Sequence, residues 1–189
     1  MKNKQPIILA SASPRRREIL QLLDIPFEAH PASGERAPEG LSPVERVEAL
    51  ARSKAEEVAA AFPERLVVGA DTMVVVDDRV LGKPRDREEA IAMLLALQGR
   101  THEVMTGVWV CAPQRAAGFV DRTQVAFYPM TRAEAAAYVD TGEPMDKAGA
   151  YGIQGRGMRF IRGIRGDFYT VMGLPGARLA RFLEEFLNL

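Results

Sequence analysis

The sequence has few of the residues that usually carry metal or nucleophilic chemistry, with one cysteine, Cys111, and two histidines, His30 and His102. A single cysteine excludes an internal disulfide framework, and the chain lacks the Cys/His groupings that zinc sites usually require. Its 25 basic and 25 acidic side chains give a net charge of zero, so the overall balance indicates neither a nucleic-acid nor a membrane partner.

Long apolar runs are also absent. No run approaches membrane-spanning length, and the few apolar residues that follow Pro6 are too short a run for a signal-peptide core. A reducing cytoplasm is therefore the expected location.

The rest of the composition is that of an ordinary globular protein, with 189 residues, 47% apolar and 26% charged. We expect a single α/β domain over residues 1–189, or two closely joined lobes. Capping residues and hydrophobic periodicity predict helices that begin at Pro14, Pro43, Arg87, Arg132 and Pro175. Alternation and apolar runs predict strands that open at Ile7 and extend over 27–32, 66–76, 79–81, 101–111, 118–128 and 158–164.

The first predicted helix starts with an unfavourable charge. Ser13 is a good N-cap residue and Pro14 suits the first helical position, but Arg15, Arg16 and Arg17 then fill the first turn, where the backbone dipole is already positive. An anionic ligand would resolve this conflict, because helix N–H groups, a serine hydroxyl and a guanidinium together form a phosphate site. The alternative is a solvated arginine face behind a capping serine.

Two charged residues fall where apolar ones are expected. Lys54 lies on the apolar stripe of the helix from Pro43, so its ammonium either reaches the rim or points at a buried anion. Asp71 lies in the middle of the apolar strand 66–76, where a carboxylate needs a partner, a metal or a proton. Gly69 would let another backbone or a ligand approach there. The alternative for Asp71 is a β-bulge whose backbone N–H groups satisfy the carboxylate.

Several other polar residues have ordinary structural explanations. Glu35 resembles a solvated loop carboxylate, His102 a polar residue at the start of a strand, and Cys111 a small core residue. The small-residue segment 143–155 either lies flat against a ligand or is an irregular linker.

Taken together, the unusual residues suit a polyphosphate with a divalent cation. Cations and helix N–H groups hold phosphates, whereas acids bind Mg²⁺ or take a proton from water. The set comprises the cations Arg15, Arg16, Lys54, Lys83 and Lys147, the acids Glu35 and Asp71, and the hydroxyl or amide residues Ser11, Thr72 and Gln154. The sequence has no Walker lysine motif and no nucleophilic triad, so direct attack by water is the simplest chemistry.

The order of short motifs along the chain resembles that of the Maf family of nucleoside triphosphate pyrophosphatases. These motifs are Leu9-Ala10-Ser11-Ala12-Ser13-Pro14-Arg15-Arg16, Gly69-Ala70-Asp71-Thr72, Gly82-Lys83-Pro84-Arg85, 146–155 and Gly173-Leu174-Pro175. The resemblance implies an elongated mixed sheet with flanking helices, and two lobes around a central cleft, as in the inosine triphosphate pyrophosphatases. It also implies a homodimer.

The resemblance further implies Mg²⁺- or Mn²⁺-dependent cleavage between the α and β phosphates of a nucleoside triphosphate. Asp71 takes the catalytic acid position, which includes metal binding, and Glu35 takes an acidic loop position that would hold metal. The phosphate-site positions fall on Ser11, Arg15, Arg16, Lys54 and Lys83. This chain has Gly34-Glu35-Arg36 where many relatives carry a pair of adjacent acids.

Three positions bear on the base. Arg15, Thr72 and Gln154 resemble the subgroup that cleaves dTTP and UTP, whereas the subgroup that acts on 7-methyl-GTP differs there. Two other functions stay open: a house-cleaning pyrophosphatase for modified purine nucleotides, and a nucleic-acid-binding regulator of septum formation. The neutral charge and the lack of a basic stripe with interleaved aromatics count against the regulator.

Overall fold

A computed structural model describes residues 5–34 and 37–187. The described chain divides into two compact units. The first unit is drawn from Met1–Asp71, Thr106–Asp121 and Gly173–Leu189, and the second unit is Thr72–Met105 with Arg122–Met172. The boundary falls inside three strands, between Asp71 and Thr72, between Met105 and Thr106, and between Asp121 and Arg122. The single domain, the elongated form and the central cleft stay predictions.

The strands form one mixed sheet of seven strands in the order β2-β1-β3-β5-β6-β7, with β4 paired to β3. Strand β1 is parallel to β2 and β3, whereas β4 is antiparallel to β3 and β7 is antiparallel to β6. This confirms the predicted mixed sheet. The strands are β1 (Ile7–Leu9), β2 (Phe27–Ala29), β3 (Val67–Val76), β4 (Arg79–Leu81), β5 (Thr101–Ala112), β6 (Arg115–Phe127) and β7 (Ile161–Arg165).

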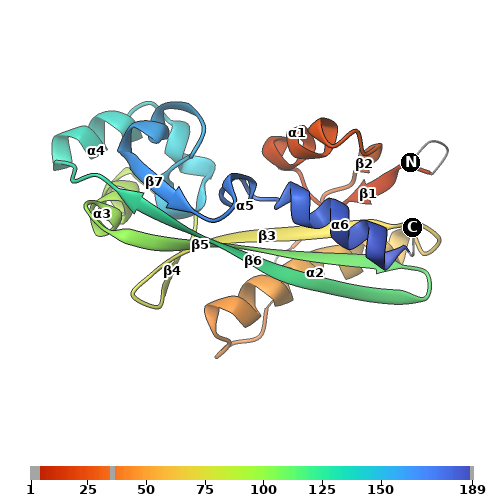
Figure 1. The fold of residues 1–189 in the computed structure, drawn as a ribbon. Helices are drawn as coiled ribbons and strands as arrows, with labels where there is room; N and C mark the ends of the chain where they lie inside the picture. Colours follow the sequence, from red (N-terminus) through yellow and green to blue (C-terminus); the bar gives the residue numbers. More distant parts are fainter. Residues whose placement is uncertain (1–4, 35–36, 188–189) are drawn as a thin grey trace. The chain divides into compact units, whose positions relative to one another are not determined.

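Helices α1, α2 and α6 belong to the first unit, and α3, α4 and α5 to the second, where α3 and α4 pack side by side (Figure 1). Their bounds are α1 (Pro14–Leu22), α2 (Pro43–Ala61), α3 (Arg87–Leu97), α4 (Arg132–Val139), α5 (Phe168–Met172) and α6 (Gly176–Phe186). Three short 3₁₀ helices lie between α4 and β7: η1 (Glu143–Asp146), η2 (Ala148–Ala150) and η3 (Gly155–Phe160). Within the described ranges, no helix is both long enough and apolar enough to span a membrane.

The helix starts follow the capping predictions closely. Complete capping boxes open α2 at Ser42 and α4 at Thr131. The box predicted at Asp86 is only half formed: its carboxylate accepts from the N–H of Glu89 at 2.8 Å, but the Glu89 carboxylate binds Arg85 instead. Each such cap is worth about 1 kcal/mol.

Helix α2 packs directly on the backbone of two strands of the first unit. A Cβ at Gly69 of β3 would lie 2.5 Å from the carbonyl oxygen of Ala51, and a Cβ at Gly107 of β5 would lie 2.6 Å from that of Val47. Only glycine permits so close an approach. The prediction that Gly69 admits another backbone is confirmed.

Two predicted strands are shorter than expected. The extended segment predicted over 27–32 is a strand only over Phe27–Ala29. The strand predicted over 158–164 begins at Ile161, because residues up to Phe160 belong to η3. Backbone N–H groups of η3 donate to the side chain of Glu143.

Candidate active site

Lys54 and Asp71 form a nearly buried ion pair in the first unit. The Lys54 Nζ donates to Asp71 Oδ1 at 2.6 Å, and each side chain is only 12% exposed. Of the two explanations for Lys54, the buried anion is therefore correct. Asp71 is satisfied by a charged partner rather than by a bulge alone, as a buried carboxylate requires.

The backbone explains how this pair meets. Gly69 and Asp71 are two residues apart on β3 and therefore point to the same face of the sheet. Gly69 lies against α2 at Ala51 and Ala55, so the side chain of Asp71 faces the same helix. Lys54 lies between these two alanines in the sequence of α2, and its ammonium reaches Asp71.

A second polar pair lies beyond the end of the neighbouring strand. The buried Ser11 follows β1, and its Oγ accepts from Arg16 Nη1 at 3.0 Å and from the N–H of Ser13 at 3.2 Å. Because Leu9 pairs with Val68 in parallel register, Ser11 lies level with Ala70 of β3, one residue before Asp71. The first unit thus gathers two of the predicted site pairs.

The arginines at the start of α1 differ in burial. Arg16 is 9% exposed and also donates from Nε to the carbonyl of Gly173 at 2.8 Å, whereas Arg15 is half-buried and Arg17 exposed. Ser13 occupies the predicted N-cap position, but its side chain makes no capping hydrogen bond. Ser11 organises this turn instead, because its hydroxyl binds both the turn backbone and Arg16.

Arg16→Ala is expected to destabilise the ligand-free protein by about 2 kcal/mol, because it removes two hydrogen bonds from a charged donor and leaves the Gly173 carbonyl without that partner. Urea unfolding at pH 7 measures this loss. The matched control, Arg17→Ala, removes an exposed cation from the positive end of the same helix and should leave stability unchanged or slightly raised. Equal stabilities for the two variants would contradict a structural role for Arg16.

The remaining described site residues lie in the second unit. Thr72 is half-buried in β3, Lys83 is exposed after β4, and Lys147 and Gln154 are half-buried around η2 and η3. The N–H of Gly149 donates to the carbonyl of Gly82 at 3.0 Å, which joins the Lys83 turn to the segment that carries Lys147 and Gln154.

The Lys147 ammonium already has anionic surroundings within its own segment. It donates to Asp146 Oδ1 at 2.6 Å and to the carbonyl of Glu143, and its side chain is 15% exposed. The segment 143–155 is therefore an ordered turn structure with short 3₁₀ helices rather than an irregular linker.

A divalent cation needs several oxygen, nitrogen or sulfur ligands close together. Among residues 5–34 and 37–187, no three His, Cys, Asp or Glu side chains gather as a metal site, and Glu35 lies outside the described residues. Protein-bound Mg²⁺ commonly uses only one or two carboxylates, with phosphate oxygens and water as the other ligands. The hard oxygens of Asp71 fit that pattern.

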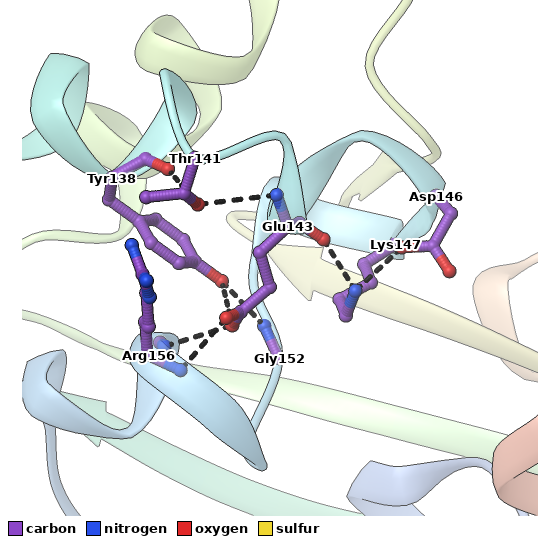
Figure 2. Close-up of polar contacts among 8 residues, drawn as sticks. Tyr138, Thr141, Glu143, Asp146, Lys147, Gly152 and Arg156 are labelled. Atoms are coloured by element: carbon purple, nitrogen blue, oxygen red, sulfur yellow. Dashed lines mark hydrogen bonds and ion pairs between the residues drawn. The ribbon is translucent and has the colours of Figure 1, made fainter.

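Sequence reasoning missed two polar clusters of the second unit. His102 lies at the start of β5, as predicted, but it is buried: it is 3% exposed, and its Nε2 lies 2.7 Å from the Tyr151 hydroxyl. Glu143, treated as part of a linker, accepts several hydrogen bonds from surrounding residues (Figure 2). The alternation of β5 carried a signal for His102, because it shares a face with Val104.

Comparisons with known proteins agree on a family. The sequence matches the Maf-like protein family over residues 6–186. A "dTTP/UTP pyrophosphatase" of Bacillus velezensis is 50% identical over 181 residues, which cover 95% of this chain and 96% of the relative. A protein of the same name from Bacillus cytotoxicus is 49% identical, over 95% of this chain and 94% of the relative.

A solved structure supports the fold. The Staphylococcus aureus Ham1 protein matches 97% of this chain and 98% of its own, with a TM-score of 0.54 and 16% identity, a likeness that concerns fold alone. It agrees with the predicted α/β class of the inosine triphosphate pyrophosphatases. With the family match over residues 6–186 and relatives about half identical along nearly their whole length, the chain belongs to the Maf family.

Proposed function

We propose that this chain hydrolyses dTTP and UTP to the nucleoside monophosphate and pyrophosphate, and so removes unwanted nucleotides from the cellular pool. Family membership and the names of the relatives support this substrate class. The same proposal places the enzyme in the cytoplasm as a homodimer, which agrees with the single cysteine and with what the family resemblance implies.

The observation that carries the proposal is the Lys54–Asp71 pair beside the Ser11 turn. A nearly buried carboxylate held by an ammonium is costly to maintain and is seldom kept for stability alone. Asp71 lies one residue further along β3 than the point level with Ser11, and α1, whose positive start favours phosphate, begins three residues after Ser11.

The roles follow from these contacts. Lys54 holds Asp71 Oδ1, so we assign the proton of the attacking water to Oδ2. Arg15 and the first turn of α1 would bind phosphate oxygens, while Arg16 keeps the Ser11 hydroxyl in place. We also assign substrate binding to Lys83 and Lys147, as the family resemblance implies.

Asp71, with Glu35 from the acidic loop, would hold the Mg²⁺ or Mn²⁺ that we propose as cofactor. When bound, such an ion neutralises the charge that develops on the phosphate oxygens. All other work in the reaction falls to side chains of this chain, which bind the triphosphate and accept the water proton.

Base selection is assigned to Arg15, Thr72 and Gln154. The Gln154 amide offers one acceptor and two donors, which suits the alternating carbonyl and N–H edge of uracil or thymine. The exocyclic amine of cytosine reverses one of these partners. A mismatched base leaves a desolvated amide unpaired, which costs about 1–3 kcal/mol.

A nucleotide panel tests the proposal. At fixed Mg²⁺, kcat/KM should be highest for dTTP and UTP, about tenfold or more lower for CTP, and lowest for purine triphosphates. Products are identified as monophosphate with pyrophosphate rather than diphosphate with phosphate. A preference for 7-methyl-GTP, GTP or ITP would overturn the pyrimidine assignment, and no pyrophosphate from any nucleotide would overturn the enzyme assignment.

A further inference from the structure

The Glu143 carboxylate accepts three hydrogen bonds within the second unit (Figure 2). Its Oε1 accepts from the Tyr138 hydroxyl at 2.9 Å and from the N–H of Gly157 at 3.1 Å, and its Oε2 accepts from the N–H of Arg156 at 2.9 Å. Its own N–H donates to Thr141 Oγ1 at 3.2 Å. One side chain therefore joins the end of α4 to the first turn of η3.

Tyr138 extends this connection to a second point of the backbone. Its hydroxyl donates to Glu143 and accepts from the N–H of Gly152 at 3.2 Å. Burial raises the pKa of the Tyr138 hydroxyl, which keeps it protonated as the donor. Although burial raises the pKa of Glu143, the N–H groups of Arg156 and Gly157 lower it to a net value below the ordinary one, so the carboxylate stays an acceptor.

Two glycines of the backbone segment that Glu143 and Tyr138 bind have no room for a side chain. Gly155 has a φ of +76°, and a Cβ there would lie 2.9 Å from Glu143 Oε2. A Cβ at Gly157 would lie 2.4 Å from the Gly152 carbonyl and 2.7 Å from the Tyr138 hydroxyl. The backbone of 152–157 is thus fitted closely around the two side chains.

Gln154 lies between the two attachment points. Gly152 is bound through Tyr138 two residues before it, and Arg156 is bound through Glu143 two residues after it. Gln154 itself has extended backbone, with φ −90° and ψ 159°, and immediately precedes η3. The direction of its Cα–Cβ bond is therefore set by a backbone that Glu143 and Tyr138 hold on both sides.

We propose that Glu143 is a positioning residue for base selection: its carboxylate fixes the 152–157 backbone and thereby aims Gln154 at the base. The inference rests on the proposed function, in which Gln154 reads the pyrimidine edge. A glutamine whose backbone can shift by a fraction of an ångström loses alignment with the donors and acceptors of the base, and discrimination depends on that alignment.

Glu143→Gln tests this role with little change of shape. In either orientation its amide nitrogen faces an N–H or O–H donor where a carboxylate oxygen stood. We expect the ratio of kcat/KM for UTP to that for CTP to fall about tenfold, with kcat for the better substrate changed much less. UTP and CTP differ only at the base edge, so the ratio reports on base reading rather than on phosphate chemistry.

The matched control is Glu134→Gln, which removes the carboxylate that completes the capping box of Thr131 at the start of α4. It should lower stability without changing the UTP/CTP ratio. Both variants are assayed well below their melting temperatures. A ratio lowered equally by both variants, or unchanged by Glu143→Gln, would overturn the inference.

A second measurement needs no activity. Amide hydrogen exchange in the ligand-free protein should accelerate at least tenfold at Gly152, Arg156 and Gly157 in Glu143→Gln, and not in Glu134→Gln. Unchanged exchange would overturn the attachment itself. Failure of the proposed function looks different: the wild-type protein then releases no pyrophosphate from either nucleotide. The exchange measurement would still test whether Glu143 holds the 152–157 backbone.

Discussion

Replacing Asp71 by asparagine is expected to lower turnover of dTTP and UTP by on the order of a hundredfold or more, as for loss of a general base. The amide keeps the size of the carboxylate, but it cannot take a proton from water. It also presents no negative charge to Lys54, whose ammonium lies 2.6 Å from Oδ1. The effect should appear in kcat, because the first unit would still bind phosphate through the α1 turn.

The same change should cost stability. With both side chains 12% exposed, removal of the anion leaves the Lys54 ammonium in a poorly solvated place without its partner, a loss of about 3 kcal/mol for pairs of this kind. Activity is therefore measured at a temperature where unfolding curves show the variant to be fully folded. The double variant Lys54→Met/Asp71→Asn should regain stability but not turnover.

The control for Asp71→Asn is Asp77→Asn. Asp77 is an exposed aspartate in the turn after the same strand, and it pairs with Arg100. That variant should keep near-normal kcat. If Asp71→Asn turns over substrate at the wild-type rate when folded and supplied with Mg²⁺, its catalytic assignment is wrong.

Acidification from about pH 6.5 to pH 4 is expected to remove about 3 kcal/mol of stability through His102 alone. Burial lowers the pKa of His102 from 6.5 to about 4. Between those values the unfolded chain binds a proton at this residue and the folded chain does not, so stability falls as pH falls. Above about pH 6.5 the contribution is complete, and below about pH 4 its slope vanishes.

The surroundings of His102 explain why the charged form is excluded. Phe127 and Tyr151 pack edge-on against the ring, and Nε2 is engaged with the Tyr151 hydroxyl. The buried Nδ1 has no hydrogen-bond partner among the residues that the structure describes. Protonation would place an N–H on both ring nitrogens without a partner for Nδ1.

A double difference isolates this effect from the other acids. Urea unfolding is measured at pH 7 and pH 4.5 for the wild type, for His102→Gln and for His30→Gln. His102→Gln should lose most of the pH dependence assigned to His102, and His30→Gln, at a histidine whose side chain is 44% exposed, is the control substitution. Equal pH dependence in the wild type and His102→Gln would show that His102 does not set the acid sensitivity.

Local sequence signals predicted the local structure well. The capping boxes at Ser42 and Thr131 involve residues three apart, so the sequence contains both partners within one helical turn. Ser13 shows the limit of such signals. It is the N-cap residue, but the hydroxyl that binds the turn belongs to Ser11, which accepts from the buried Arg16; Arg16 in turn donates to the distant carbonyl of Gly173.

Features that depend on distant partners could not be predicted from pattern alone. The stripe position of Lys54 left two explanations, and only the approach of α2 to Gly69 decides between them. The predicted start of β7 is too early, because the preceding residues form η3. The N–H of Arg156 in η3 donates to the side chain of Glu143, thirteen residues earlier in the chain. The strand start at His102 is correct, but its burial is missed although its alternation with Val104 indicates the inward face.

Helix α2 packs directly on the backbone at Gly69 and Gly107. The distance from Lys54 Nζ to Asp71 Oδ1 therefore depends on contacts between backbone atoms. In most helix-on-sheet contacts the spacing is set by side-chain volume, so a smaller or larger core residue shifts the helix. Here the carbonyls of Ala51 and Val47 already contact β3 and β5. The helix therefore cannot move closer to the sheet when a neighbouring side chain is replaced by a smaller one. The core around this helix can therefore exchange apolar residues while the separation of ammonium and carboxylate stays constant.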